Sequence, residues 1–331
     1  MSEPSTPRQM VKALVHGAMP PRPLLAPIIF SLGARLQNVS LRQFLTNPTK
    51  IVNALRQIRS VLKVDGLTCY FDPFLEAEAL GCKREWRADG SCAMARPSFG
   101  SVDQLRSELT AVESLPGAGN IPVACEVLRR LKAILQDEPA LMVRVSGPLS
   151  LAARLAASAP PELVEFASEV VATVTKSFAE AGADIVLLVE DSLPDSSSES
   201  LDWYGSLVTP IANAVRFYEA LPVVSWGATS AAELSSLVER SWDWALCPLL
   251  TSEMLAGGAP SHAKQACTAL ALPSGDFCGG AILPDSLSNP NLSLVTSAED
   301  IHPTVDVKQL VQALDAIRER RRLQRSIQSS I

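Results

Sequence analysis

Residues Val64–Cys82, with the sequence VDGLTCYFDPFLEAEALGC, decide the fold. An apolar run, Gly66–Phe71, ends at the carboxylate of Asp72, and Pro73 then opens an acidic helical turn that stops at Gly81. A short apolar run followed at once by a helix is typical of a buried parallel strand. The carboxyl end of such a strand carries the chemistry in a β/α barrel, so Asp72 is the first candidate for an active-site residue.

The same alternation of strand and helix continues along the chain and predicts a parallel sheet. Pro48–Leu62 and Pro161–Glu180 show the apolar spacing of amphipathic helices. Eight strands suit a closed (β/α)8 TIM barrel better than an open doubly wound sheet. The expected strands are Leu24–Phe30, Gly66–Phe71, Leu141–Val145, Ala183–Val189, Leu221–Trp226, Trp244–Leu249, Gly280–Leu283 and Leu292–Ser297.

The rest of the chain is divided around this barrel. We expect residues 1–22 to be a poorly ordered N-terminal arm with one helical extension at Arg8–His16, and residues 23–325 to be a single barrel domain. Glu85–Phe99 is predicted to be a hairpin or long loop because it is polar and contains glycine and proline. Pro260–Ala269 is predicted to be a helix.

Composition excludes several classes of function. The chain has a formal net charge of -6 and a pI near 5.3, which argues against a nucleic-acid or anionic-membrane partner. Its apolar runs are too short to cross a bilayer. Seven cysteines without a C-x-x-C pair indicate reduced thiols, so we expect a cytoplasmic protein.

Known short motifs narrow the chemistry further. No G-x-G-x-x-G or P-loop pattern opens a helix, so the common nucleotide-binding motifs are absent. No H-E-x-x-H, H-x-x-x-H or H-x-C spacing occurs, so a ready-made zinc motif is absent as well. Cys278 and Glu299 could both be metal ligands if the last two strands are neighbours, although a buried cysteine is more often simple packing.

Polar residues at the carboxyl ends of the expected strands are the candidate site residues. Carboxylates, an arginine, hydroxyls and thiols would meet there, which suits acid–base or metal chemistry. The alternative is that they cap the helices that follow, as Asp72 before Pro73 would do. The candidates are Ser31, Arg35, Asp72, Ser146, Glu190, Asp191, Ser225, Trp226, Cys247, Cys278, Glu299, Asp300 and His302.

Five segments carry a family resemblance, namely DGLTCYFDPFLEAEALGC (65–82), SGPLSLAARL (146–155), AGADIVLLVEDS (181–192), ALPVVSWGA (220–228) and EDIHPTVDVKQLVQAL (299–314). Through them the chain resembles the uroporphyrinogen decarboxylase superfamily, which also contains corrinoid- and thiol-dependent methyltransferases. EAEALGC is more similar to the methyltransferase branch. The resemblance implies a (β/α)8 barrel, a small-molecule or tetrapyrrole substrate and a possible corrinoid protein partner, and it allows a homodimer.

The decarboxylase motifs are only partly kept. The acid that binds pyrrole N–H groups in that branch matches Asp72. The arginine-rich N-terminal motif keeps only Arg35, the tyrosine position is Arg154, and the late H-G-I motif is Glu299-Asp300-Ile301. These losses argue against uroporphyrinogen itself as the substrate, because too few matched cations remain for its carboxylates.

The methyltransferase zinc site is not matched either. The resemblance places its H-x-C pair at Val224 and Trp226, and its late cysteine near Glu299. Either the ligands are rearranged, in which case Glu190, Cys247, Cys278 and Glu299 are candidates, or the protein needs no metal. Zinc and a corrinoid are therefore the candidate cofactors, and a carboxy-lyase would need none.

The favoured hypothesis is an enzyme of the methyltransferase-like branch, with methyl transfer that involves a corrinoid or a thiol acceptor. The alternatives are a tetrapyrrole carboxy-lyase and a non-catalytic protein that binds a tetrapyrrole or corrinoid. The hypothesis assigns acid–base or metal-binding roles to Asp72, Glu190 and Glu299. It assigns substrate binding to Arg35, Ser31, Ser146, Arg154, Trp226 and His302, and metal binding to Cys278 and Cys247.

Overall fold

A computed structural model describes residues 6–87, 90–95, 101–136, 138–191, 194, 197–227, 231–256, 267–278, 283–289 and 292–328. Eight parallel strands form one sheet in the order β1-β10-β9-β8-β7-β6-β5-β2, which confirms the predicted barrel. The strands are β1 (Leu24–Leu25), β2 (Gly66–Tyr70), β5 (Ala140–Ser146), β6 (Ile185–Glu190), β7 (Leu221–Trp226), β8 (Cys247–Leu250), β9 (Thr268–Leu272) and β10 (Leu292–Ser297).

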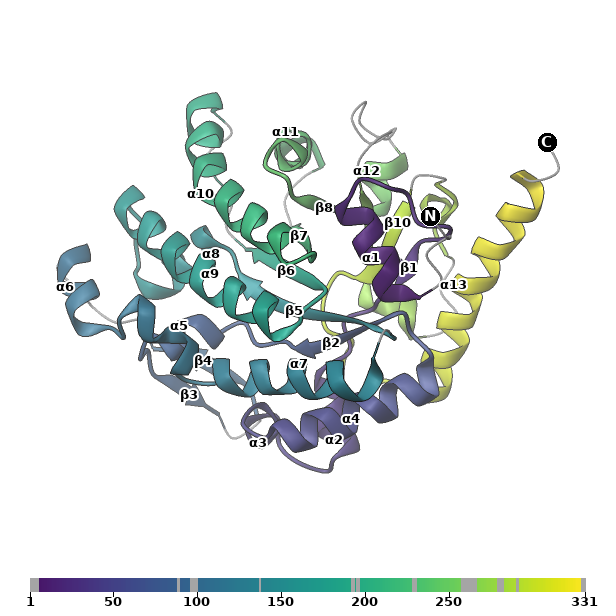
Figure 1. Cartoon of the computed structure of the whole chain (residues 1–331), viewed down its shortest axis with the longest axis horizontal. Coiled ribbons are helices and arrows are strands. Elements are labelled where there is room, and N and C mark those ends of the chain that lie inside the picture. The colour runs from purple at the N-terminus through teal and green to yellow at the C-terminus, as the bar shows by residue number, and fades with distance from the viewer. Residues whose placement is uncertain are drawn as a thin grey trace.

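Helices surround these strands, and α7, α9 and α10 lie side by side along one flank (Figure 1). No helix in the described ranges is long and apolar enough to span a membrane. The helices are α1 (Pro7–Val15), α2 (Ser31–Leu36), α3 (Leu41–Leu45), α4 (Pro48–Leu62), α5 (Leu75–Ala79), α6 (Val102–Glu108), α7 (Ile121–Leu135), α8 (Pro148–Leu155), α9 (Pro161–Ala181), α10 (Ser198–Phe217), α11 (Ala231–Asp243), α12 (Ser252–Ala256) and α13 (Val307–Gln328), with short 3-10 helices η1 (Val112–Gly117), η3 (Ser274–Phe277) and η4 (Asp285–Ser288).

Asp65, the residue before β2, joins the two ends of the sheet. Its N–H donates to the Leu25 carbonyl at 2.9 Å, and its carboxylate accepts a bond from the Leu25 N–H at 2.8 Å. Arg22 donates to both Asp65 oxygens, at 2.5 and 2.7 Å. At Gly66 a Cβ would lie 2.6 Å from the Cβ of Ala26, so glycine permits this close approach. The ring is thereby closed between β1 and β2.

The core has an inner and an outer layer, which follow the two-residue alternation along each strand. On β5, Ala140 and Met142 belong to the inner layer, where residues of the barrel strands pack on one another. Leu141 and Val143 belong to the outer layer, which packs against the helices. The inner face of β5 therefore continues toward its carboxyl end through Arg144 and Ser146.

Helix α1 closes the inner layer at the amino ends of the strands. Met10, Val11 and Leu14 are buried in that layer, and Arg8 forms an ion pair with Asp184, just before β6, at 2.8 Å. The helical extension predicted at Arg8–His16 is therefore confirmed as α1, and it packs against the barrel. Its amphipathic pattern was visible in the sequence, but the surface that it covers exists only once the barrel has formed.

The helix prediction for Pro260–Ala269 is wrong at its end. Thr268 and Ala269 begin β9, the seventh strand of the sheet. Alanine favours a helix locally, but pairing with β8 and β10 outweighs that preference. The strand predicted at Gly280–Leu283 lies outside the described residues except for Leu283, which is not in a strand.

Two smaller expectations are resolved by the structure. The regular ladder of β1 covers only Leu24–Leu25 of the predicted Leu24–Phe30. The hairpin predicted at Glu85–Phe99 is present, and its antiparallel strands are β3 (Arg84–Trp86) and β4 (Cys92–Met94). This hairpin matters for the site because Arg84 reaches Asp72.

Candidate active site

Arg144 is the charged residue that β5 places on the inner face of the barrel near the carboxyl end. It is 3% exposed, and its Nη1 donates to the Asp72 carbonyl at 3.3 Å and to Ser146 Oγ at 3.1 Å. Its guanidinium lies 5.8 Å from the ring centre of Phe71. Burial lowers the Arg144 pKa, and the nearby Glu76 carboxylate opposes that effect.

Ser146 connects Arg144 to a second arginine and to a buried acid. Its N–H and Oγ donate to the two Glu76 oxygens at 2.9 and 2.8 Å, and Arg154 Nη1 donates to its Oγ at 3.3 Å. Arg154, from the last turn of α8, also pairs with Asp191 after β6. The structure thus brings two predicted residues, Ser146 and Arg154, into one cluster with Arg144 at the mouth of the barrel.

Arg144 is not among the predicted site residues. Those were chosen at the carboxyl ends of the expected strands, and Arg144 lies two positions before the end of β5. A signal was present in the sequence, since ALMVRVS (140–146) is an apolar strand with one internal charge. A charged residue in a buried strand is costly unless it is paired or functional. Its position two residues before Ser146 puts both side chains on the same face.

Asp72 lies at the same end of the barrel but is already paired. Its Oδ2 accepts a bond from Arg84 Nη2 at 2.6 Å, and its Oδ1 accepts one from the Phe74 N–H at 3.0 Å. Arg84 also contacts Glu78 at 3.1 Å, and both side chains of the Asp72–Arg84 pair are 2% exposed. The hairpin β3–β4 therefore covers this carboxylate.

Glu190 is fully buried behind the mouth. Its Oε2 accepts a bond from the Ser150 N–H at 2.8 Å, and its Oε1 accepts bonds from the Leu149 N–H at 3.1 Å and from Tyr204 Oη at 2.6 Å. Burial raises the Glu190 pKa, and the bonds from Tyr204 and Ser150 oppose that shift. Geometrically, Glu190 caps the amino end of α8, where a negative charge is favourable.

Four of the residues with an assigned role, together with the candidate Asp300, lie near the carboxyl end of β10 instead. Asp300 accepts bonds from the Phe30 and Ser31 N–H groups at 2.8 and 3.0 Å, and Arg35 donates to the Val305 carbonyl at 2.8 Å. The exposed Glu299 and His302 bond to Ser274 and Thr304, both at 2.7 Å. Ser31, Arg35, Glu299 and His302 thus form a separate part of the rim.

Trp226 and Cys247 do not reach the mouth. Trp226 packs against Tyr204 and Trp244 in the outer layer, with ring centres 5.9 and 6.4 Å away, and its indole N–H donates to Ser241 Oγ. Cys247 begins β8 and belongs to the inner layer at the opposite end of the barrel from the mouth. These placements follow from the two-residue alternation and from the strand direction.

The described residues do not fit the zinc site that the resemblance implies. Val224 and Trp226 both face the outer layer. Cys278 follows η3 at the rim of the mouth, whereas Cys247 begins β8 at the amino end of the barrel. Among the described side chains, no three His, Cys, Asp or Glu residues are grouped so that they could hold a metal ion.

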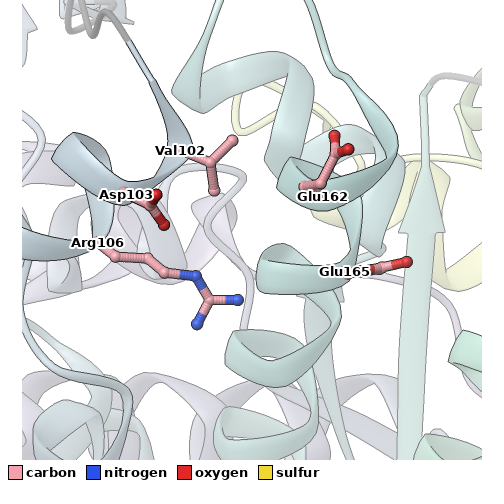
Figure 2. A pocket seen from close by; sticks show the side chains of 5 residues that line it. All are labelled: Val102, Asp103, Arg106, Glu162 and Glu165. Carbon is pink, nitrogen blue, oxygen red and sulfur yellow. The ribbon is translucent and has the colours of Figure 1, made fainter.

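Two surface hollows lie outside the cluster at the mouth. One, of about 390 Å³, separates α6 from α9; Arg106 projects into it from α6, and Glu162 and Glu165 come from α9 (Figure 2). The other, of about 370 Å³, is lined by residues that include Arg84, Trp86 and Asn120. The first lies on the outer flank, and the second abuts the Asp72–Arg84 pair.

Comparison with known proteins agrees with this architecture. Over 95% of this chain and 98% of the other, it superposes on a methyltransferase from Methanosarcina mazei, with a TM-score of 0.71 and 15% identity. It also superposes on a B12-independent methionine synthase from Shewanella sp. W3-18-1, over 95% and 100% of the two chains, with a TM-score of 0.58 and 14% identity. At such identities the likeness is one of fold. A search of curated protein sequences found no relative.

The sequence profile of one family matches most of the barrel. The profile described as "Uroporphyrinogen decarboxylase (URO-D)" matches residues 6–205, which include α1, the hairpin and the cluster around Ser146. This chain therefore belongs to the uroporphyrinogen decarboxylase (URO-D) family.

Proposed function

We propose that this protein is a methyltransferase-like enzyme of the URO-D superfamily that binds an anionic small molecule at the mouth of the barrel. The observation that carries the proposal is the position of Arg144 on the inner face of β5, joined to Arg154 through Ser146 Oγ. Guanidinium groups in a partly dehydrated site recognise carboxylates and similar anions well. The mouth of a β/α barrel is where substrates of such enzymes bind.

The methyltransferase branch is preferred over the decarboxylase branch for three reasons. EAEALGC (76–82) is more similar to that branch, and a methyltransferase shares the fold over nearly the whole chain. The excess of positive charge in the cluster is also small, since Asp191 pairs with Arg154 and the Glu76 carboxylate lies near Arg144. It suits an acceptor with one or two anionic groups better than a tetrapyrrole with many.

In this proposal the arginines bind and orient the acceptor. Arg144 and Arg154 would hold its carboxylate, so that a thiolate on the same molecule faces the centre of the mouth. The acceptor thiol gives its proton to solvent, and its sulfur then takes the methyl group from an external methylated corrinoid, which keeps the electron pair of the bond that breaks. Asp72 would support the site indirectly, because its backbone carbonyl holds Arg144 and its side chain holds the hairpin.

The test measures demethylation of methylcob(III)alamin by its absorbance, with homocysteine as the acceptor, because homocysteine carries both a thiol and a carboxylate. We expect turnover that needs the thiol and the protein. Arg144→Met should lower kcat/KM roughly 10- to 100-fold, the loss expected for one charged hydrogen-bonding partner. Arg144→Lys should retain more activity, and the exposed Arg129→Met on α7 is the matched control.

Other outcomes would decide between the alternatives. Release of CO2 from uroporphyrinogen, without methyl transfer, would overturn the proposal in favour of a carboxy-lyase. A tetrapyrrole or cobalamin that binds without turnover would indicate a binding protein. Activity that is unchanged in a folded Arg144→Met variant would show that the anion binds elsewhere.

A further inference from the structure

We propose that Cys247 and Cys267 form a redox-sensitive dithiol that closes reversibly to an intramolecular disulfide at the amino end of the barrel. Both thiols are free, and their Sγ atoms lie 2.8 Å apart. Cys247 is the first residue of β8, and Cys267 directly precedes β9. This pair is remote from the cluster around Arg144 and does not depend on the proposed methyl transfer.

The register of the sheet places the two cysteines opposite each other. β8 and β9 are parallel neighbours, and Leu249 lies opposite Ala269. Cys247 lies two residues before Leu249, and Cys267 lies two residues before Ala269. The two cysteines are therefore opposite each other, with both side chains on the inner face. Neighbouring strands are about 4.8 Å apart, which lies within the Cα separation of about 4.4–6.8 Å that a disulfide requires.

Nearby residues fix the backbone at both thiols. The Trp242 indole N–H donates to the Cys267 carbonyl at 3.3 Å, and Cys247 Sγ lies 3.3 Å from the same oxygen. Arg216 bonds to the Ala245 carbonyl at 2.9 Å and to the Val15 carbonyl at 3.1 Å, which ties this corner to the end of α1. A pair held in this way loses little conformational freedom when it closes.

Accessibility determines the order of the chemical steps. Cys247 is 1% exposed, and burial raises its thiol pKa, whereas Cys267 is partly exposed. A small disulfide such as oxidised glutathione would react first with the Cys267 thiolate, forming a mixed disulfide and releasing one glutathione thiolate. Cys247 then loses its proton and attacks the Cys267 sulfur, and the second glutathione leaves. The two protein thiols are oxidised, and one glutathione disulfide is reduced to two thiols.

The experiment uses the full-length chain in which the two other thiols that reach the surface, those of Cys92 and Cys278, are removed by Cys92→Ser and Cys278→Ser. After incubation with oxidised glutathione we expect a loss of about 2 Da and no bound glutathione. Trypsin should then yield tryptic peptides 241–264 and 265–308 joined to each other. The oxidised protein should melt roughly 3–6 °C higher, because the bond closes a loop in the unfolded chain. Reduced glutathione should reverse both changes.

Two variants test the order of the steps. In Cys247→Ser the reaction should stop with glutathione on Cys267, and Cys267→Ser should not react at this site. Cys125→Ser, a buried thiol elsewhere in the outer layer, is the control and should behave like the parent. Unlinked peptides in the parent, glutathione that stays on Cys267, or a bond to another cysteine would overturn the proposal.

Discussion

At the scale of single residues, Gly147 and Glu190 depend on each other. Gly147 joins β5 to α8, and a Cβ on it would lie 2.2 Å from Cδ of Glu190. Because Glu190 is buried and accepts three hydrogen bonds, it cannot move away cheaply. We therefore expect Gly147→Ala to lower the free energy of unfolding by roughly 2–3 kcal/mol in urea titrations, as an overpacked core does.

Gly275→Ala is the matched control, because a Cβ there meets no atom within 4 Å. It should change the free energy of unfolding by less than about 0.5 kcal/mol. If the two variants were equally stable, Glu190 would have to be mobile, and its description as a fixed cap of α8 would be wrong.

The same residues show how far the sequence could lead. The carboxyl end of β6 and its acid, Glu190, were predictable because an apolar run ends there. Whether that acid faces the mouth or the helices depends on the strand register, which one residue of slip reverses. Glu190 and Trp226 therefore lie at the predicted positions in their strands, but their side chains point outward to the helices. The side chain of Arg144 points into the barrel.

At the scale of elements, a buried ion pair helps to dock α1 on the barrel. Arg8 Nε contacts Asp184 at 2.8 Å, and the two side chains are 7% and 12% exposed. Burial raises the Asp184 pKa, and Arg8 lowers it. Arg8→Met should therefore leave a buried carboxylate without its cation and destabilise the fold by about 3 kcal/mol near pH 7.

This loss should depend on pH in one direction. A carboxyl group whose folded pKa is raised contributes its stability when it is protonated, and this contribution is lost as pH rises through the folded pKa. Without Arg8 the Asp184 pKa rises further, so the gap between wild type and Arg8→Met should widen from about pH 4.5 to about pH 7.5. Urea unfolding at both pH values measures it.

Lys12→Met on the same helix is the control, since its pair with Glu219 is half exposed and should matter little. A gap that is constant with pH would mean that Arg8 stabilises α1 through its other contacts, such as its bond to the Gln136 carbonyl, and not through the charge of Asp184. The sequence predicted α1 itself, but not this docking, because Arg8 and Asp184 are brought together only by the closed barrel.

At the scale of the whole molecule, the barrel is closed at β1 and β2 by the side chain of Asp65. Seven pairs of neighbouring strands are joined by parallel ladders. The contact between β1 and β2 consists instead of hydrogen bonds among Leu25, Asp65 and Arg22. Asp65→Ala would leave the Leu25 N–H without its carboxylate acceptor. We expect a loss of about 2–4 kcal/mol in the free energy of unfolding.

Amide hydrogen exchange can locate that loss. Peptides that cover residues 24–30 and 64–70 should exchange faster in Asp65→Ala, because the seam opens locally before the barrel unfolds. Peptides that cover β6 and β7 should keep their protection at low denaturant, since their ladder does not involve Asp65. Glu169→Gln, which breaks an exposed pair with Arg106, is the control. Uniformly faster exchange would instead mean that the barrel opens only as one cooperative unit, and that Asp65 stabilises the whole ring rather than its seam.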